Sequence, residues 1–270
     1  QQLRTGFSFS RRSLSANVGR RVSSAVSVTG NYLLQRTSVF NLQVSPSDLL
    51  FIDRTFPQFR LSSFSGSLIY DTRNDAVDPV AGNYANANLQ VAGQNIGSEV
   101  GFVKSFFTAE VFRQLPRAPR LVFAANARFG LANGFANQGE LPASERFFAG
   151  GDTTNRGFAL DTLGVRHVPA QPGDTLDQAG FPIGGNGVVV LMGEVRARLA
   201  GSFGVVGFVD TGNVFAHATD IDVTELRSAV GGGIRYKSPF GPIRLDLGFK
   251  VHPQPGESPT AWFVSFGQAF

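Results

Sequence analysis

Apolar and polar residues alternate along most of the chain with a period of two, which is the period of a β-strand. The clearest case is residues 243–251, where apolar residues recur at every odd position and Arg244, Asp246 and Lys250 lie between them. The same alternation recurs near residues 26–35, 121–131, 189–199 and 226–237. A helical period of 3.6 residues fits almost nowhere, so the pattern predicts an all-β chain.

The alternation places eleven strands. They are expected at residues 3–14, 22–40, 60–72, 84–97, 100–113, 120–132, 187–200, 203–215, 226–238, 243–252 and 260–270. Short turns are expected at 15–21, 74–82, 116–119, 201–202 and 239–242, and long loops at 43–59, 133–186, 216–225 and 252–259, with 96–101 as a short exception. Outer-membrane barrels likewise combine tight periplasmic turns with long extracellular loops. The last strand would then place Phe270 at the periplasmic edge.

The composition favours a membrane environment. Charged residues make up 16% of the 270 residues, whereas a soluble domain has roughly 25%. Uninterrupted apolar runs, such as Val188–Met192, reach only five residues, and a membrane-spanning helix needs about 18. An apolar residue at every second position explains a mean hydropathy of +0.00. The sequence therefore predicts an all-β, transmembrane antiparallel β-barrel with an apolar lipid face and a polar, water-filled lumen.

An odd number of strands conflicts with this prediction. Single-chain bacterial barrels have even strand numbers, and an open sheet would leave unpaired backbone groups in lipid. Either a twelfth strand escapes the pattern, or the chain is the C-terminal part of a larger barrel. The chain begins at Gln1 without an initiator Met or a signal segment, which favours the second interpretation.

Four motifs occur in order along the chain. They are Tyr70-Asp-Thr-Arg-Asn74 with Asp78-Pro-Val-Ala-Gly82, then Asn155-Arg-Gly-Phe158, Phe208-Val-Asp-Thr-Gly212, and the terminal Phe266-Gly-Gln-Ala-Phe270. Together they resemble motifs of the bacterial surface antigen family, the outer-membrane assembly and translocation barrels of the BamA/TamA type. Asn155 stands where that family usually has Val.

The resemblance implies a sixteen-stranded barrel preceded by periplasmic POTRA domains. Residues 1–270 would form a single barrel domain with about 11–12 of those strands, while the N-terminal strands and POTRA domains would be absent. Residues 133–186 would be a long extracellular loop that folds into the lumen. The location implied is the cell outer membrane of Gram-negative type, where the chain would be a multi-pass barrel.

The resemblance also implies a non-enzymatic role in inserting β-barrel proteins into the outer membrane or in translocating a polypeptide. In the family, a weak seam between the first and last strands lets incoming strands pair. The implied partners are outer-membrane lipid, unfolded β-barrel substrates or a secreted polypeptide, and periplasmic accessory lipoproteins. Two-partner secretion and patatin-linked transporters of the same family are alternatives, and a passive porin-like diffusion channel is an alternative of another class.

Arg156 is the first candidate functional residue. A guanidinium inside the lumen needs carboxylate partners, and its planar fork suits bidentate pairing. Parity turns Asp210 and Glu194 inward, and the resemblance implies that Arg156 pairs with one or both and anchors the loop. Alternatively, Asp210 merely balances lumen arginines. Within the motif of Asn155, Arg156, Gly157 and Phe158, Gly157 is expected to supply backbone freedom and Phe158 a packing anchor.

The end of the chain is the second candidate site. Trp262, Val264, Phe266 and Phe270 share one parity and are expected to face lipid. The resemblance implies that they form, with Gly267, a terminal β-signal that is read during insertion of the barrel itself. The alternative is that Phe270 is an ordinary residue of the aromatic girdle.

Enzymatic and nucleic-acid functions find little support. His167, His217 and His252 lie far apart in expected loops or at a strand end, without metal-ligand spacing. Nucleophile and phosphate-binding motifs do not occur in the sequence. The basic residues are scattered singly, although the net charge is +4, so nucleic acid is not an expected partner. We expect no enzymatic activity, no metal and no cofactor.

Overall fold

The computed structural model describes residues 2–3, 8–40, 58–135, 141–239 and 241–270. These residues form one antiparallel sheet whose twelve strands follow one another in chain order. The strands are β1 (Gln2–Leu3), β2 (Ser8–Arg21), β3 (Val26–Phe40), β4 (Gln58–Asp71), β5 (Gly82–Ala92), β6 (Phe102–Leu115), β7 (Ala118–Gly134), β8 (Gly187–Arg198), β9 (Phe203–Phe215), β10 (Arg227–Ser238), β11 (Gly241–Lys250) and β12 (Thr260–Phe266). The prediction of an all-β antiparallel fold is confirmed.

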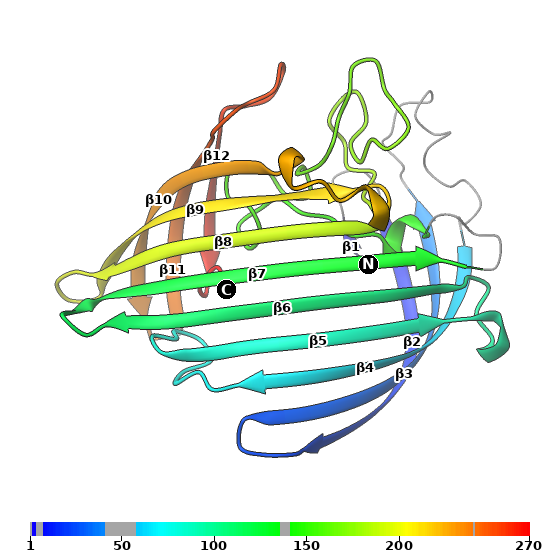
Figure 1. The fold of residues 1–270 in the computed structure, drawn as a ribbon, viewed down its shortest axis with the longest axis horizontal. Coiled ribbons are helices and arrows are strands. Elements are labelled where there is room, and N and C mark those ends of the chain that lie inside the picture. The colour runs from blue at the N-terminus through cyan, green and yellow to red at the C-terminus, as the bar shows by residue number, and fades with distance from the viewer. Residues whose placement is uncertain (1, 4–7, 41–57, 136–140, 240) are drawn as a thin grey trace.

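The sheet curves around an interior but does not close (Figure 1). Its two edges in the described part of the chain are β1 and β12, which do not pair with each other. The short 3₁₀ helices η2 (Gln94–Ile96), η3 (Ala143–Glu145), η4 (Ala218–Asp220) and η5 (Val223–Glu225) lie in the connections. Among the described residues, no helix is long and apolar enough to cross a membrane.

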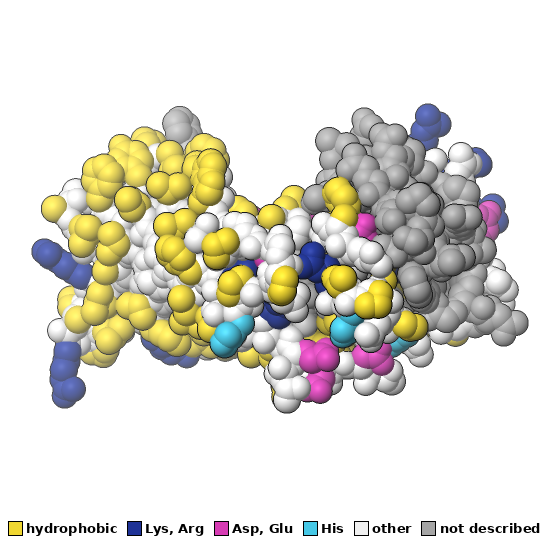
Figure 2. Space-filling view, turned by 90° about the horizontal axis from the view of Figure 1, so that it is seen from above, with side chains coloured by type: hydrophobic (Ala, Val, Ile, Leu, Met, Phe, Trp, Pro, Cys, Tyr) yellow, Lys and Arg dark blue, Asp and Glu magenta, His cyan; other side chains and the backbone are white. Residues whose placement is uncertain are grey.

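The two faces of the sheet follow the predicted parity. On β11, Leu245 and Leu247 are 45% and 43% exposed, whereas Arg244 and Asp246 are 1% and 0% exposed. Leu191 on β8 is likewise exposed. Figure 2 shows hydrophobic side chains gathered over the outside of the molecule, with Lys and Arg projecting beyond the end where short turns connect the strands. Apolar residues therefore cover the outer face, and charged residues are buried inside.

The interior is not a simple polar channel. Val188, Val190 and Met192 of β8 point inward and belong to a buried apolar cluster with residues of the segment between β7 and β8. The expectation of a water-filled lumen is therefore wrong for this part of the interior. The cluster exists because the loop fills the space, so inward positions beneath it meet side chains instead of water.

The first hairpin differs from the prediction. Residues 15–21, expected as a turn, continue β2 as far as Arg21, and the connection to β3 is at residues 22–25. Asn17 and Gly19, inside the expected turn, pair with Asn31 and Thr29 in the ladder. The backbone hydrogen bonds of a long hairpin thus prevail over local turn propensity. Likewise, β5 ends at Ala92, before the predicted 97. The predicted loop 43–59 lies almost entirely outside the described residues.

The last four residues also depart from the predicted strand. β12 ends at Phe266, and Gly267 has a φ of +86°, which turns the chain out of the alternating pattern. Phe270 therefore does not face lipid as parity predicted. Its ring lies inside, 6.2 Å from the ring of Phe112 between centroids, and the guanidinium carbon of Arg196 is 5.7 Å from its centroid.

Candidate functional site: a loop fixed inside the sheet

The segment between β7 and β8 folds back against the inner face of the sheet. In Figure 1 it begins at the end of the sheet opposite the short turns. Two backbone hydrogen bonds between Phe147 and Gly185, of 2.8 and 3.0 Å, join its two arms. Phe158 and Leu163 are each 1% exposed. This part of the segment thus packs into the interior, whereas Leu160 and Val168 are 56% and 76% exposed.

Arg156 lies at the centre of the buried segment with no exposed side-chain surface. Its Nε and Nη2 donate to the two carboxylate oxygens of Asp210 on β9, each at 2.8 Å. Its Nη1 donates to Oε2 of Glu194 on β8 at 2.6 Å. The guanidinium carbon lies 3.6 Å from the centroid of the Phe208 ring. The structure thus brings Arg156 together with both of the carboxylates expected from the sequence.

The network balances every buried charge with another. The backbone N–H of Arg156 also donates to Asp210 at 3.0 Å, and Glu194 accepts a second hydrogen bond, of 2.6 Å, from Nε of Arg196. Glu194 and Asp210 have no exposed side-chain surface. An ionised group withdrawn from water is costly unless it is paired and hydrogen-bonded. Removing any member of the network would therefore leave its partners buried without a counter-charge.

Close approach explains the glycine in the motif. The φ of Gly157 is not positive, so the expected backbone freedom is not what this position uses. Instead, a Cβ at Gly157 would overlap the Cβ of Ala229 on β10. A Cβ at Gly248 on β11 would in turn overlap the carbonyl of Arg156. Small residues in the loop and on the strands therefore let the loop backbone contact β10 and β11 directly.

Asn155 and Phe158 complete the contacts of the loop motif. Asn155 is fully buried, donates to the carbonyl of Arg227 at 3.1 Å, and accepts from the N–H of Gly157 at 3.2 Å. Two cations lie near the Phe158 ring, with Arg227 at 4.7 Å and Lys250 at 4.6 Å from its centroid. Such cation–π contacts are stabilising where water is excluded.

Asp152 is a site residue that the sequence analysis did not identify. Its carboxylate accepts hydrogen bonds from Nη2 of Arg244 on β11, at 2.6 Å, and from Oγ of Ser265 on β12, at 2.5 Å. Arg244 also donates to the carbonyl of Asp152 at 2.7 Å. Arg244 was placed on the polar face of its strand, but alternation alone gives no signal for a partner in a distant loop.

Residues 144–145 of the loop contact strands in the N-terminal half of the sheet. Arg11 on β2 donates to the carbonyl of Ser144 at 2.7 Å and to Oε1 of Glu145 at 3.0 Å. Lys104 on β6 donates to the carbonyl of Glu145 at 2.7 Å. The loop therefore contacts strands near both edges of the sheet.

A further ion cluster lies at the β11–β12 connection. Glu257 accepts two hydrogen bonds from Arg227, of 2.7 and 2.6 Å, and its Oε2 lies 3.3 Å from Nζ of Lys250. Burial opposes ionisation of Glu257, but the hydrogen bonds from Arg227 and the Gln254 N–H, together with the positive charges of Arg227 and Lys250, lower its pKa to about 2. The carboxylate is thus ionised at neutral pH.

The residues of the expected terminal signal fall into two groups. Trp262, Val264 and Phe266 are 71%, 62% and 76% exposed on the outer face of β12. Gly267 and Phe270 lie beyond the strand, where Nη2 of Arg196 donates to the carbonyl of Phe270 at 3.4 Å. The structure thus does not gather these residues on one surface.

His167 and His217 make their contacts outside the Arg156 network. His167 and His217 each contact a loop aspartate, at 2.6 Å to Asp174 and at 2.7 Å to Asp220. Within the described residues, no three His, Asp or Glu side chains are grouped so that they could hold a metal ion.

An antiparallel meander with an apolar outer face and a buried, charge-anchored loop is typical of an outer-membrane β-barrel protein. The model of the Omp85 superfamily domain matches residues 3–270. The chain therefore belongs to the Omp85 superfamily, which confirms the resemblance to assembly and translocation barrels drawn from the four motifs.

The curated relatives include two named assembly proteins. The chain is 28% identical over 207 residues to the outer membrane protein assembly factor BamA of Nitratidesulfovibrio vulgaris, covering 74% of this chain and 24% of that protein. It is 32% identical over 126 residues to the sorting and assembly machinery component 50 homolog of Bos taurus, covering 46% and 25%. The chain thus spans about a quarter of the length of these relatives.

Solved structures share the fold. The structure of BamA from Haemophilus ducreyi lacking POTRA domains 1–3 matches with a TM-score of 0.78 at 18% identity, over 97% of this chain and 55% of that one. CdiB from Acinetobacter baumannii matches with a TM-score of 0.57 at 13% identity, over 97% and 43%. These likenesses show a barrel-type fold.

Proposed function

We propose that this chain forms the C-terminal part of a barrel that inserts β-barrel proteins into an outer membrane or translocates a polypeptide across it, without enzymatic chemistry. Periplasmic accessory lipoproteins and unfolded polypeptides would be its partners, in a membrane of Gram-negative type. The named assembly roles of the two curated relatives support insertion as the leading activity.

The observation that carries the proposal is the fully buried contact of Arg156 with Asp210 and Glu194. A passive channel would need no Arg-Gly-Phe loop paired to an aspartate on a strand. Breaking a buried ion pair by removing one partner costs about 3–5 kcal/mol, so the network holds the loop in one position. In this proposal Arg156 anchors the loop, and the anchored loop keeps the interior and the last strands in a working arrangement.

The last strand supplies the second part of the proposal. In the described sheet β12 pairs with β11, and the family resemblance implies that its other edge lies at the weak seam of the barrel. An incoming strand could add there by β-augmentation. Trp262, Val264 and Phe266 on its outer face would sit in lipid while this pairing takes place. As proposed from the family resemblance, the terminal residues through Phe270 would also act as the insertion signal of this protein.

A reconstituted assay tests the proposal. The protein in phospholipid vesicles should convert an added unfolded β-barrel substrate into a protease-protected form that resists unfolding in detergent without heating. Arg156→Ala should lower the yield strongly and Arg156→Lys partly, because Lys keeps the charge but loses the bidentate fork. Arg117→Ala, in the exposed β6–β7 turn, is the matched control and should behave as the unaltered protein. Equal yields with and without the protein would contradict the proposal.

Two further measurements on the reconstituted protein separate the alternatives. A passive diffusion channel would show steady conductance at high open probability in planar bilayers without assembling the substrate. A secretion transporter of the same family would protect a translocated polypeptide inside the vesicle without integrating it into the membrane. Integration of the substrate is the result expected here.

A further inference from the structure

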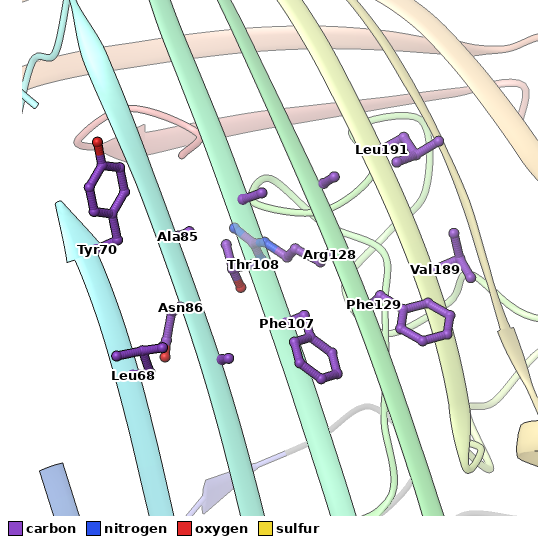
Figure 3. A pocket seen from close by; sticks show the side chains of 13 residues that line it. Leu68, Tyr70, Ala85, Asn86, Phe107, Thr108, Arg128, Phe129, Val189 and Leu191 are labelled. Carbon is purple, nitrogen blue, oxygen red and sulfur yellow. The ribbon is translucent and has the colours of Figure 1, made fainter. Parts of the chain in front are cut away.

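The outer face of the sheet carries a groove that spans β4 to β8 (Figure 3). Its volume is about 460 Å³, within the range of about 300–1,000 Å³ that is usual for small-molecule sites. Figure 3 shows the bulky side chains of Phe107, Phe129 and Leu191 among those that line the groove, and the short side chain of Ala85 on β5.

The strand register explains the floor of the groove. Ala85 of β5 pairs with Ala109 of β6, which pairs with Ala127 of β7. Three consecutive strands thus present a methyl group at the same level. Tyr70 of β4 and Leu191 of β8 end this row on its two sides. The alanine row is therefore lower than the surface around it.

The adjoining row forms one wall. Phe107 pairs with Phe129, and Phe129 with Val189, directly beside the alanine row. A second hollow of about 370 Å³ shares Leu68, Ala87 and Phe107 with the first and continues toward β3. Two apolar hollows with a common wall therefore lie next to each other on the lipid face.

A cation lies on the same face near the short-turn end. Arg113 of β6 has the parity of Phe107 and Ala109, is exposed, and pairs across the ladder with Phe123. Its guanidinium donates to the carbonyls of Gly82 and Phe112 and to Oδ1 of Asn83. Within the described residues it has no carboxylate partner, so its charge and its remaining donors are available.

The spacing suits a membrane lipid. Arg113 is four residues from Ala109, which is ~13 Å along a strand at about 3.3 Å per residue and roughly 10 Å along the membrane normal for a strand tilted by about 40°. Half of an apolar band about 25 Å tall is roughly 12 Å. An acyl chain whose headgroup lies at Arg113 would therefore reach the alanine row within one leaflet.

We propose that the two hollows bind the two acyl chains of one anionic phospholipid of the periplasmic leaflet, with Arg113 holding its phosphate. This binding site goes beyond the assembly function and does not depend on it. Charge-assisted hydrogen bonds from Arg113 hold the phosphate, and the preference for an anionic lipid arises because the choline cation of a zwitterionic phosphatidylcholine is repelled by Arg113. Burial of acyl methylenes against the alanine row supplies the affinity.

Native mass spectrometry tests the site. The protein is reconstituted in nanodiscs of equal parts phosphatidylglycerol and phosphatidylcholine, transferred to mild detergent, and its retained phospholipids are counted and identified. The unaltered protein should retain one phospholipid, with phosphatidylglycerol enriched roughly tenfold, as expected for one charge-assisted contact. The double variant Ala109→Leu, Ala127→Leu fills the groove and should lose the retained lipid. Arg113→Gln should retain a lipid but with no headgroup preference.

Matched variants complete the test. Val230→Leu enlarges an exposed outer-face residue on β10, and Arg20→Gln removes an exposed cation of outward parity on β2. Both should retain phosphatidylglycerol as the unaltered protein does. Folding of each variant is checked by its resistance to detergent unfolding before heating. Undiminished retention in the folded groove-filled variant, or an unchanged headgroup preference in Arg113→Gln, would overturn the proposal.

Discussion

Oγ of Ser265 in the last strand donates a hydrogen bond of 2.5 Å to the carboxylate of Asp152, 113 residues earlier in the chain. The same carboxylate oxygen accepts from Arg244 of the neighbouring strand. The buried loop is thereby linked to β12, which has β11 as its one ladder partner in the described sheet. The position of the loop and the order of the last strand should depend on each other.

Asp152→Asn tests that dependence. The amide keeps the shape of the side chain but removes its charge, so the contacts with Arg244 and Ser265 weaken. Hydrogen exchange should then accelerate several-fold in residues 260–266 and remain unchanged in β6 and β7, because local openings follow local stabilisation. Glu225→Gln, an exposed carboxylate between β9 and β10, is the control. Equal protection of β12 in both variants would refute the link.

Arg156 and Asp210 should prove strongly coupled. Arg156→Ala leaves two buried carboxylates without this partner and should lower the free energy of unfolding by about 3–5 kcal/mol. A double-mutant cycle with Asp210→Asn isolates the pair, since the double variant should lose clearly less than the sum of the single losses. Urea unfolding in vesicles gives the energies, and limited proteolysis reports release of the loop. Strictly additive losses would contradict direct pairing.

Two glycines offer a matched test of close packing. A Cβ at Gly248 would overlap the backbone carbonyl of Arg156, whereas a Cβ at Gly207 on β9 would meet no atom within 4 Å. Gly248→Ala should therefore displace the loop, increase its cleavage by protease and cost about 1–3 kcal/mol, as overpacking does. Gly207→Ala should leave both measurements within error. Similar behaviour of the two variants would show that the loop backbone does not touch the wall at β11.

The β11–β12 connection should respond to acid. The lowered pKa of Glu257, about 2 in the folded chain, compares with about 4.3 for a free glutamate. Because the folded value is depressed, the stabilisation is complete above about pH 4.3 and is lost as pH falls toward about 2. The chain has no cysteine, so Pro255→Cys gives a single labelling site.

A fluorophore at that site reports the mobility of the connection. Its anisotropy should stay constant from pH 7 to about pH 4.5 and then fall. Adding Glu257→Gln should give low anisotropy at every pH, because the neutral amide loses the attraction to Arg227 and Lys250. An acid transition that persists in the Gln variant would assign the change to another group.

Alternation predicted which residues face inward because side chains on a strand alternate by geometry. That rule was sufficient to place Asp210 and Glu194 inside and Leu245 outside, and a buried arginine then required carboxylates. It failed where the backbone leaves the strand, as at Gly267, whose positive φ sends Phe270 inward. It also failed at the first hairpin, where residues 15–21 pair with β3 and do not form the expected turn.

Other features could not be read from periodicity at all. The partners of Asp152 depend on the path of a loop that has no repeating pattern. The role of Gly157 depends on the distance to Ala229, which only the packed structure defines. The lipid groove depends on register, because alanines on three strands form a floor only when the ladder aligns them.

The loop between β7 and β8 contacts Arg11 near one edge of the sheet and Ser265 at the other. The residues that accept these hydrogen bonds, Glu145 and Asp152, are only seven positions apart. In mechanical terms the loop is a cross-brace. Its short segment links β2 and β12, two strands that the backbone ladder does not join to each other.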